Sequence, residues 1–107
     1  MRLKLTTLIA FTIPIWLMST TQALACPVSG TVYGARSVIV RLINPNNGNF
    51  LMEANATPGY YFSSIPSGRY LLRVYNRSGR RISTNPSQLE VYCRGGFPIE
   101  GQNFHIN

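Results

Sequence analysis

Hydrophobic and polar residues alternate with a period of two along much of residues 26–107. No window places apolar residues at the three- and four-residue spacing of an amphipathic helix. Short alternating runs, separated roughly every 8–12 residues by Gly, Pro, Asn or Ser, are typical of β-sandwiches and barrels. The pattern predicts seven strands, at residues 28–33, 37–43, 50–54, 60–63, 69–76, 89–93 and 102–106.

The alternation also predicts which side of each strand faces the core, because successive side chains of a strand point to opposite faces. A shift of one residue would exchange the two faces. The predicted core consists of Val38, Val40, Leu42, Tyr60, Phe62, Ile65, Tyr70, Leu72 and Val74. In strands 37–43 and 69–76, the residues between these core positions therefore point outward.

Several segments carry a family resemblance. They are Gly30-Thr-Val32, Val38-Ile-Val-Arg-Leu42, Gly48, Gly59-Tyr-Tyr-Phe62, Ile65-Pro-Ser-Gly-Arg-Tyr-Leu-Leu-Arg-Val74 and Asn103-Phe104-His-Ile106. Together they resemble the carboxypeptidase regulatory-like domains, the collagen-adhesin B-type repeats and the wider transthyretin-like, or prealbumin-like, sandwiches, over nearly all of residues 26–107. The resemblance implies a small all-β fold, a seven-stranded antiparallel Greek-key sandwich that is transthyretin-like or Ig-like.

The sequence also departs from these families. Many adhesin repeats hold an internal Lys–Asn isopeptide bond, but no Lys follows residue 25, so this bond cannot form here. The enzymatic branch of the transthyretin family, hydroxyisourate hydrolase, relies on several His and Arg residues and a C-terminal Tyr-Arg-Gly-Ser. This chain has one His and ends in His105-Ile-Asn107. We therefore expect no activity of that type.

Residues 1–25 have the features of a cleaved secretory signal. A basic start precedes an apolar run at 5–18, and Ala23-Leu-Ala25 supplies small residues at positions −3 and −1 of a cleavage site. The apolar run is about 14 residues long, and roughly 20 are needed to span a bilayer. We expect a single exported domain at 26–107, periplasmic or secreted. Lipid attachment at Cys26 is the alternative, and Ala-Leu-Ala fits a lipoprotein signal poorly.

Cys26 and Cys93 are the only cysteines, so a single intramolecular pairing is available. Export makes a disulfide chemically plausible. A domain of this size buries a modest core and benefits from such a cross-link. Closing a loop of roughly 67 residues is worth about 4 kcal/mol in the chain-entropy model. The chain contains no Cys-x-x-Cys motif, so we expect a structural disulfide rather than a redox pair.

Charge and composition narrow the range of functions. The chain carries ten Lys and Arg against three Asp and Glu, a net charge of +7; removing residues 1–25 takes away two bases and leaves +5 over 82 residues. The acids are Glu53, Glu90 and Glu100, and the single His is His105. Paired-carboxylate sites, zinc sites and catalytic triads need more such residues. We expect no catalytic residue, no metal site and no cofactor.

The resemblance places strands 37–43 and 69–76 side by side, so that their outward residues form one surface. The predicted binding surface comprises Ile39, Arg41, Ile43, Leu71, Arg73 and Tyr75. Aliphatic residues mixed with Tyr and Arg are typical of an interface core. The alternative site is a basic turn with Arg77, Arg80 and Arg81, where binding would be mainly electrostatic. A solvated sheet face with no binding role is the other interpretation of the pattern.

These observations favour a non-catalytic, exported binding or assembly module. Its partner would be an envelope or surface protein, or an anionic surface polysaccharide. The alternatives are a small carbohydrate-binding module that uses exposed Tyr33, Tyr61, Tyr75 and Tyr92, and a secreted effector or inhibitor of another protein. Nucleic acid would suit the basic residues, but an exported protein rarely meets it. We expect no transmembrane segment after the signal.

Overall fold

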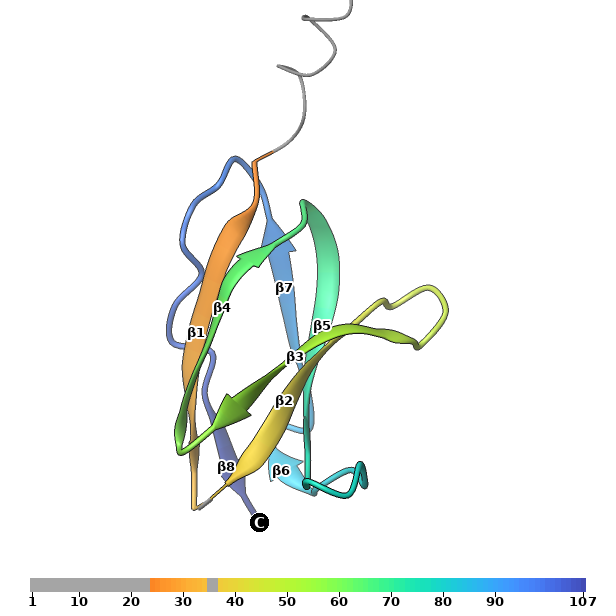
Figure 1. The fold of residues 1–107 in the computed structure, drawn as a ribbon, viewed down its shortest axis with the longest axis vertical. Coiled ribbons are helices and arrows are strands. Elements are labelled where there is room, and N and C mark those ends of the chain that lie inside the picture. The colour runs from red at the N-terminus through yellow and green to blue at the C-terminus, as the bar shows by residue number, and fades with distance from the viewer. Residues whose placement is uncertain (1–23, 35–36) are drawn as a thin grey trace, which may run out of the picture.

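The computed structural model describes residues 24–34 and 37–107, and this part of the chain forms eight β-strands and no helix. The strands are β1 (Cys26–Tyr33), β2 (Val38–Ile43), β3 (Phe50–Ala56), β4 (Gly59–Ile65), β5 (Gly68–Tyr75), β6 (Thr84–Asn85), β7 (Leu89–Cys93) and β8 (Phe104–Ile106). They form two four-stranded sheets, in the orders β4-β1-β8-β6 and β3-β2-β5-β7. In Figure 1, β1 and β4 lie to the left and β2, β3 and β5 to the right. The predicted all-β, two-sheet architecture is confirmed.

Two details of the predicted topology are wrong. The described residues form eight strands rather than seven, because the two-residue strand β6 pairs with β8 at a sheet edge and is too short to show alternation. The sheets are also not purely antiparallel, since β1 and β8 pair in parallel through Val32 and Phe104. The chain after β7 runs back along β1, where Ile99 bridges Val28 in parallel, and so enters the sheet in the direction of β1.

The core lies between the two sheets and matches the alternation closely. Of the nine predicted core residues, all but Tyr70 are buried. Tyr70 packs against the core while its hydroxyl donates a hydrogen bond to the Ser67 carbonyl oxygen, 3.2 Å away, so it stays half-buried. Phe104 is fully buried and fills the core from β8. One side of β2 and β5 therefore packs in the core, and the side chains on their other side face away from it.

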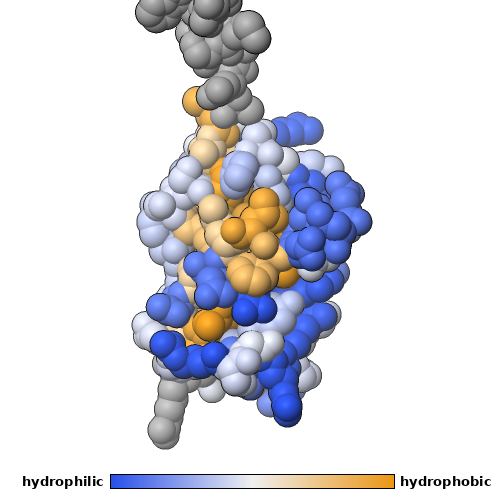
Figure 2. Space-filling view, turned by 45° about the vertical axis from the view of Figure 1, so that its right-hand side comes forward, coloured by the Kyte–Doolittle hydropathy of each residue, from blue (hydrophilic) through white to orange (hydrophobic). Residues whose placement is uncertain are grey.

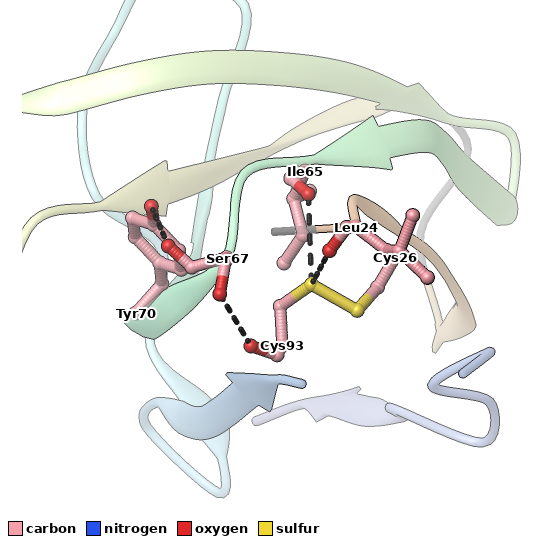
Figure 3. The surroundings of a disulfide bond; sticks show 6 residues. All are labelled: Leu24, Cys26, Ile65, Ser67, Tyr70 and Cys93. Carbon is pink, nitrogen blue, oxygen red and sulfur yellow. Dashed lines mark hydrogen bonds between the residues drawn. A yellow bond between two sulfur atoms is a disulfide. The ribbon is translucent and has the colours of Figure 1, made fainter. Parts of the chain in front are cut away.

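The disulfide between Cys26 and Cys93 ties the two sheets together and confirms the predicted pairing. It joins the start of β1 to the end of β7, and both residues are buried. Figure 3 shows the Cys93 sulfur near the carbonyl oxygens of Leu24, at 3.5 Å, and Ile65, at 3.7 Å. A disulfide sulfur carries no hydrogen, so these are packing contacts. A Cys26 sulfur bonded in this way cannot also carry a lipid thioether.

Most of the predicted signal segment, residues 1–23, lies outside the described residues. Leu24 is exposed, and Cys26 begins the folded strand β1. Among the residues that the structure describes, no helix is long and apolar enough to cross a membrane.

Gly30 allows the segment before β8 to lie directly on β1. The Gln102 amide donates a hydrogen bond to the Ser29 carbonyl oxygen, at 3.1 Å, and the Gln102 carbonyl oxygen accepts one from the Tyr60 hydroxyl, at 2.6 Å. A Cβ atom on Gly30 would lie 1.9 Å from that Gln102 oxygen and 2.8 Å from the Tyr60 oxygen. No side chain fits there, so the glycine is required for the close approach.

Leu72 and Leu71 test the register of β5. Leu72 is fully buried in the core, so Leu72→Ala should lower the free energy of unfolding by roughly 2–5 kcal/mol. Leu71 faces the other way and is half-buried. We expect Leu71→Ala to lower it by less than half as much. Chemical denaturation of both variants measures the difference, and equal losses would mean that the register is shifted by one residue.

Gly30 and Gly59 form a matched pair on the paired strands β1 and β4. Gly30→Ala should lower the free energy of unfolding by about 3 kcal/mol, at the upper end of overpacking effects, because the new methyl group meets a backbone carbonyl. A Cβ on Gly59 has only the Gly30 oxygen at 3.9 Å, an ordinary contact. Gly59→Ala should therefore change stability by less than about 1 kcal/mol. A tolerated Gly30→Ala in thermal denaturation would contradict this packing.

Candidate binding surface

The pairing of β2 with β5 brings the six predicted surface residues together. Their antiparallel register aligns Ile39 with Tyr75, Arg41 with Arg73, and Ile43 with Leu71. We call the side of sheet β3-β2-β5-β7 that faces away from the core the outer face. Figure 2, in which the right-hand side of Figure 1 is turned forward, shows apolar residues gathered at the middle of this side with hydrophilic residues around them.

One of the six predictions needs correction. Ile43 is only 2% exposed, although it does not belong to the core cluster. It pairs with Phe50 on one side and with Leu71 on the other. Ile43 therefore packs beneath its neighbours Phe50 and Leu71 and has almost no exposed surface for a partner to contact. The other five residues are half-buried, a degree of exposure that still allows contact.

The edge strand β3 adds an aromatic residue that the sequence analysis missed. Phe50 is 48% exposed beside Ile43, and Leu51 next to it is 46% exposed. The register between β2 and β3 shifts at Leu42 and Ile43, where a bulge makes room for an extra residue. Simple alternation does not foresee such a bulge. Phe50 is the first residue of the strand predicted at 50–54, and only the pairing with β2 shows which face it joins.

Arg41 is held at the centre of the outer face by two aromatic rings and a carboxylate. The guanidinium carbon lies 4.2 Å from the centre of the Phe50 ring and 4.6 Å from the centre of the Tyr75 ring. Its Nε donates a hydrogen bond to Glu53 at 3.1 Å. A cation above aromatic rings is attracted by their electron-rich faces. The side chain is 21% exposed and is fixed in one orientation by these three neighbours.

Arg73 differs from the other two arginines of this face. Arg41 pairs with Glu53, and Arg69 forms an ion pair with Glu90 across to β7. The Nε of Arg73 instead donates to the neutral amide oxygen of Gln88, at 3.0 Å. Within residues 24–34 and 37–107, no carboxylate lies in ion-pair distance of Arg73. Its positive charge is therefore not compensated by the residues described.

The basic turn predicted as the alternative site adjoins the outer face. Arg77, Arg80 and Arg81 are all exposed. Arg77 donates to the Ser37 hydroxyl at 2.8 Å, and Arg81 to the Ser87 carbonyl oxygen at 2.9 Å. Arg81 also forms an isolated bridge with Tyr75, and a Cβ on Gly79 would lie 3.9 Å from a terminal nitrogen of Arg41. The two predicted sites are thus neighbours in space.

A depression of about 610 Å³ lies between the edges of β3 and β4. Its lining consists of Gly30, Glu53, Ala54, Asn55, Gly59, Tyr60 and Tyr61. Tyr61 is 61% exposed and offers a free ring. Burial raises the pKa of the Tyr60 hydroxyl well above its ordinary value, so this group stays protonated and serves as a hydrogen-bond donor.

The tyrosines proposed for sugar binding do not share one surface. Tyr33 and Tyr92 are exposed like Tyr61, whereas Tyr75 is half-buried under Arg41. Tyr33 stacks on His105, with ring centres 4.8 Å apart. Tyr33 and Tyr61 belong to β1 and β4, and Tyr92 to the other sheet. The described residues contain no group of three His, Cys, Asp or Glu arranged to hold a metal ion.

Comparison with known proteins yields no relative. No family model matches the chain, and no curated protein or solved structure matches it either. The resemblance to the carboxypeptidase regulatory-like and transthyretin-like sandwiches therefore stays a prediction, and what the structure supports is the coarser description of two four-stranded β-sheets.

Proposed function

We propose that this protein is a non-catalytic binding module that acts outside the cytoplasm and contacts a protein partner through the outer face. The observation that carries the proposal is the composition of that face. Ile39, Leu71, Tyr75 and exposed Phe50 surround two adjacent arginines on the side of the sheet that faces away from the other sheet. Apolar residues that gather on one surface, with polar residues around them, mark interaction sites.

The residue types of the outer face are those that dominate measured interfaces. Tyr and Arg are enriched among the residues whose truncation weakens binding most. Arg41 is already held between Phe50 and Tyr75, so it loses little conformational freedom when a partner arrives. A solvated face with no binding role gives no reason for this arrangement, because apolar residues left at the surface, above all exposed Phe50, add nothing to solubility.

Export is supported by two independent features. Residues 1–25 have the pattern of a secretory signal. The Cys26–Cys93 disulfide is of a kind that persists in oxidising compartments and is rare in the cytosol. We place the protein in the periplasm or the secreted fraction, with a mature chain that begins at Cys26.

The family assignment supports the proposal by analogy. The support is indirect, because the resemblance concerns the fold and a fold by itself does not determine function. The resemblance rests on the segments from Gly30 to Val74 and from Asn103 to Ile106 named above. The outer face supports binding whether or not the chain belongs to these families.

Substitutions on the outer face should weaken partner capture. We expect Arg73→Ala and Tyr75→Ala each to reduce capture of the partner from a native envelope extract by about tenfold or more, with the fold retained. Quantitative affinity capture with the mature, disulfide-bonded protein measures this effect, and thermal denaturation checks the fold. Arg80→Ala and Arg81→Ala serve as controls on the adjoining turn and should have little effect.

The opposite outcome is equally informative. If the turn variants abolish capture and the outer-face variants do not, the site is the basic turn. An interaction of exposed charges weakens steeply as salt is raised, because screening acts strongly on exposed groups. The partner would then be an anionic surface polymer. A secreted effector or inhibitor would use the same outer face, and the identity of the captured protein distinguishes that role from assembly.

A carbohydrate-binding module is a second candidate, favoured by the depression between β3 and β4. Exposed Tyr61 could stack on a sugar ring, with the Asn55 and Glu53 side chains alongside. In a glycan-array experiment, Tyr61→Ala should then abolish the signal. Tyr92→Ala is the matched control, because Tyr92 is 58% exposed but lies on the other sheet. Absence of any glycan signal from the wild-type protein would remove this candidate.

A further inference from the structure

We infer that the partner binds the outer face with an acidic residue flanked by apolar ones, and that its carboxylate lies over Arg73. The occupant is a polypeptide segment that carries Asp or Glu. This inference rests on the proposed function and specifies the chemistry of the partner. It is supported by the charge balance of the face, the free hydrogen-bond donors of its arginines, and the residues around them.

The charge balance leaves one positive charge at the centre of the face. Arg41 and Arg69 each have a glutamate partner among the described residues, and Arg73 has only the amide of Gln88. Arg73 also stands directly opposite Arg41 in the register of β5 and β2. Like charges at directly opposed positions of neighbouring strands destabilise a sheet. A carboxylate placed between the two guanidinium groups would relieve this repulsion.

Both arginines offer unused donors for such a carboxylate. Among the described residues, each uses its Nε in a side-chain hydrogen bond, Arg41 to Glu53 and Arg73 to Gln88. Neither donates from its terminal nitrogens to a protein acceptor in that part of the chain. The planar guanidinium group matches a carboxylate in a two-point contact, and charge-assisted hydrogen bonds are stronger than neutral ones. Arg41 is already oriented by the Phe50 and Tyr75 rings.

The surroundings of Arg73 favour a polypeptide over a polysaccharide. Its neighbours on the outer face include Ile39, Leu71 and Tyr75, which suit the apolar side chains that flank an acidic residue in a peptide. Sugar hydroxyls placed over aliphatic groups would lose hydrogen bonds to water without replacement. An anionic polysaccharide would find better contacts at the exposed turn 77–81.

A second copy of this chain does not fit the face. In a twofold dimer the same surface meets itself, so residues near the axis face their own copies. Arg41 and Arg73 occupy the centre of the outer face and would be brought close to Arg41 and Arg73 of the second copy. The glutamates of the face, Glu53 and Glu90, lie on the edge strands and are already paired. The partner must therefore bring its own negative charge.

Selection from a random-peptide display library tests the inference with the mature, disulfide-bonded protein as the target. We expect the enriched peptides to contain Asp or Glu between apolar residues. With Arg73→Gln as the target, enrichment of acidic residues should fall severalfold, because only the donors of Arg41 remain. Arg69→Gln is the matched control, since Arg69 lies on the same strand and face but already pairs with Glu90. It should select the same acidic peptides as the wild-type protein.

A double-mutant cycle then locates the carboxylate. The best enriched peptide should bind the wild-type protein about tenfold more tightly than the same peptide with its acidic residue replaced by the amide. With Arg73→Gln this preference for the acidic peptide should fall severalfold, because only the donors of Arg41 remain. Fluorescence polarisation measures the four dissociation constants, and thermal denaturation confirms that each variant is folded.

The possible failures separate the inference from the proposed function. Neutral or basic enriched peptides, no enrichment at all, or an equal preference for the acidic peptide in Arg73→Gln would overturn the inference. If the enriched peptides still bind Leu71→Asp and Tyr75→Ala as they bind the wild-type protein, the outer face is not the site and the proposed function fails as well. If these two variants lose binding of peptides without an acid, the outer face stands as the site and only the acidic requirement is wrong.

Discussion

The antiparallel pairing of β2 with β5 is the constraint on which the other features depend. Five residue pairs, from Ile39 with Tyr75 to Ile43 with Leu71, align the two central strands of one sheet. The same register places Val40, Leu42, Leu72 and Val74 on the core side. Because side chains alternate between faces, a one-residue shift in register that disrupted the core would also separate the residues of the outer face. The packing of the core therefore also preserves the arrangement of the outer face, although the residues of that face contribute little to the core.

The two central arginines of the outer face have different surroundings. Arg41 lies between Phe50 and Tyr75 and also reaches Glu53, so its position is determined by three contacts. Lysine could not replace it, because an ammonium group lacks the planar shape that stacks on rings and forms two-point contacts. Arg73 has no comparable set of partners among the described residues. The charge of Arg41 is paired and held in place. The charge of Arg73 beside it has no carboxylate partner among the described residues.

The sequence predicted the faces of the alternating strands well and the contacts between strands poorly, for physical reasons. Five of the six core residues predicted on β2 and β5 are buried, and so are the three predicted on β4. The bulge beside Ile43, which brings Phe50 onto the outer face, depends on pairing between strands and leaves no signal in either strand alone. The parallel entry of β8 depends on the absence of a side chain at Gly30, opposite Gln102. The neutral partner of Arg73, Gln88, lies outside every predicted strand.

The two basic regions of this protein differ in the kind of binding they can support. On the turn 77–81 the arginines are exposed, so their interactions are screened by salt and confer little selectivity. Arg73 is half-buried among Leu71, Ile39 and Tyr75, where screening is weaker and a wrongly placed charge is penalised. Electrostatic complementarity of this kind sets specificity more than affinity. The net positive charge would therefore attract acidic partners in general. The outer face would select among them, because a partner's carboxylate and the apolar residues beside it must both fit there.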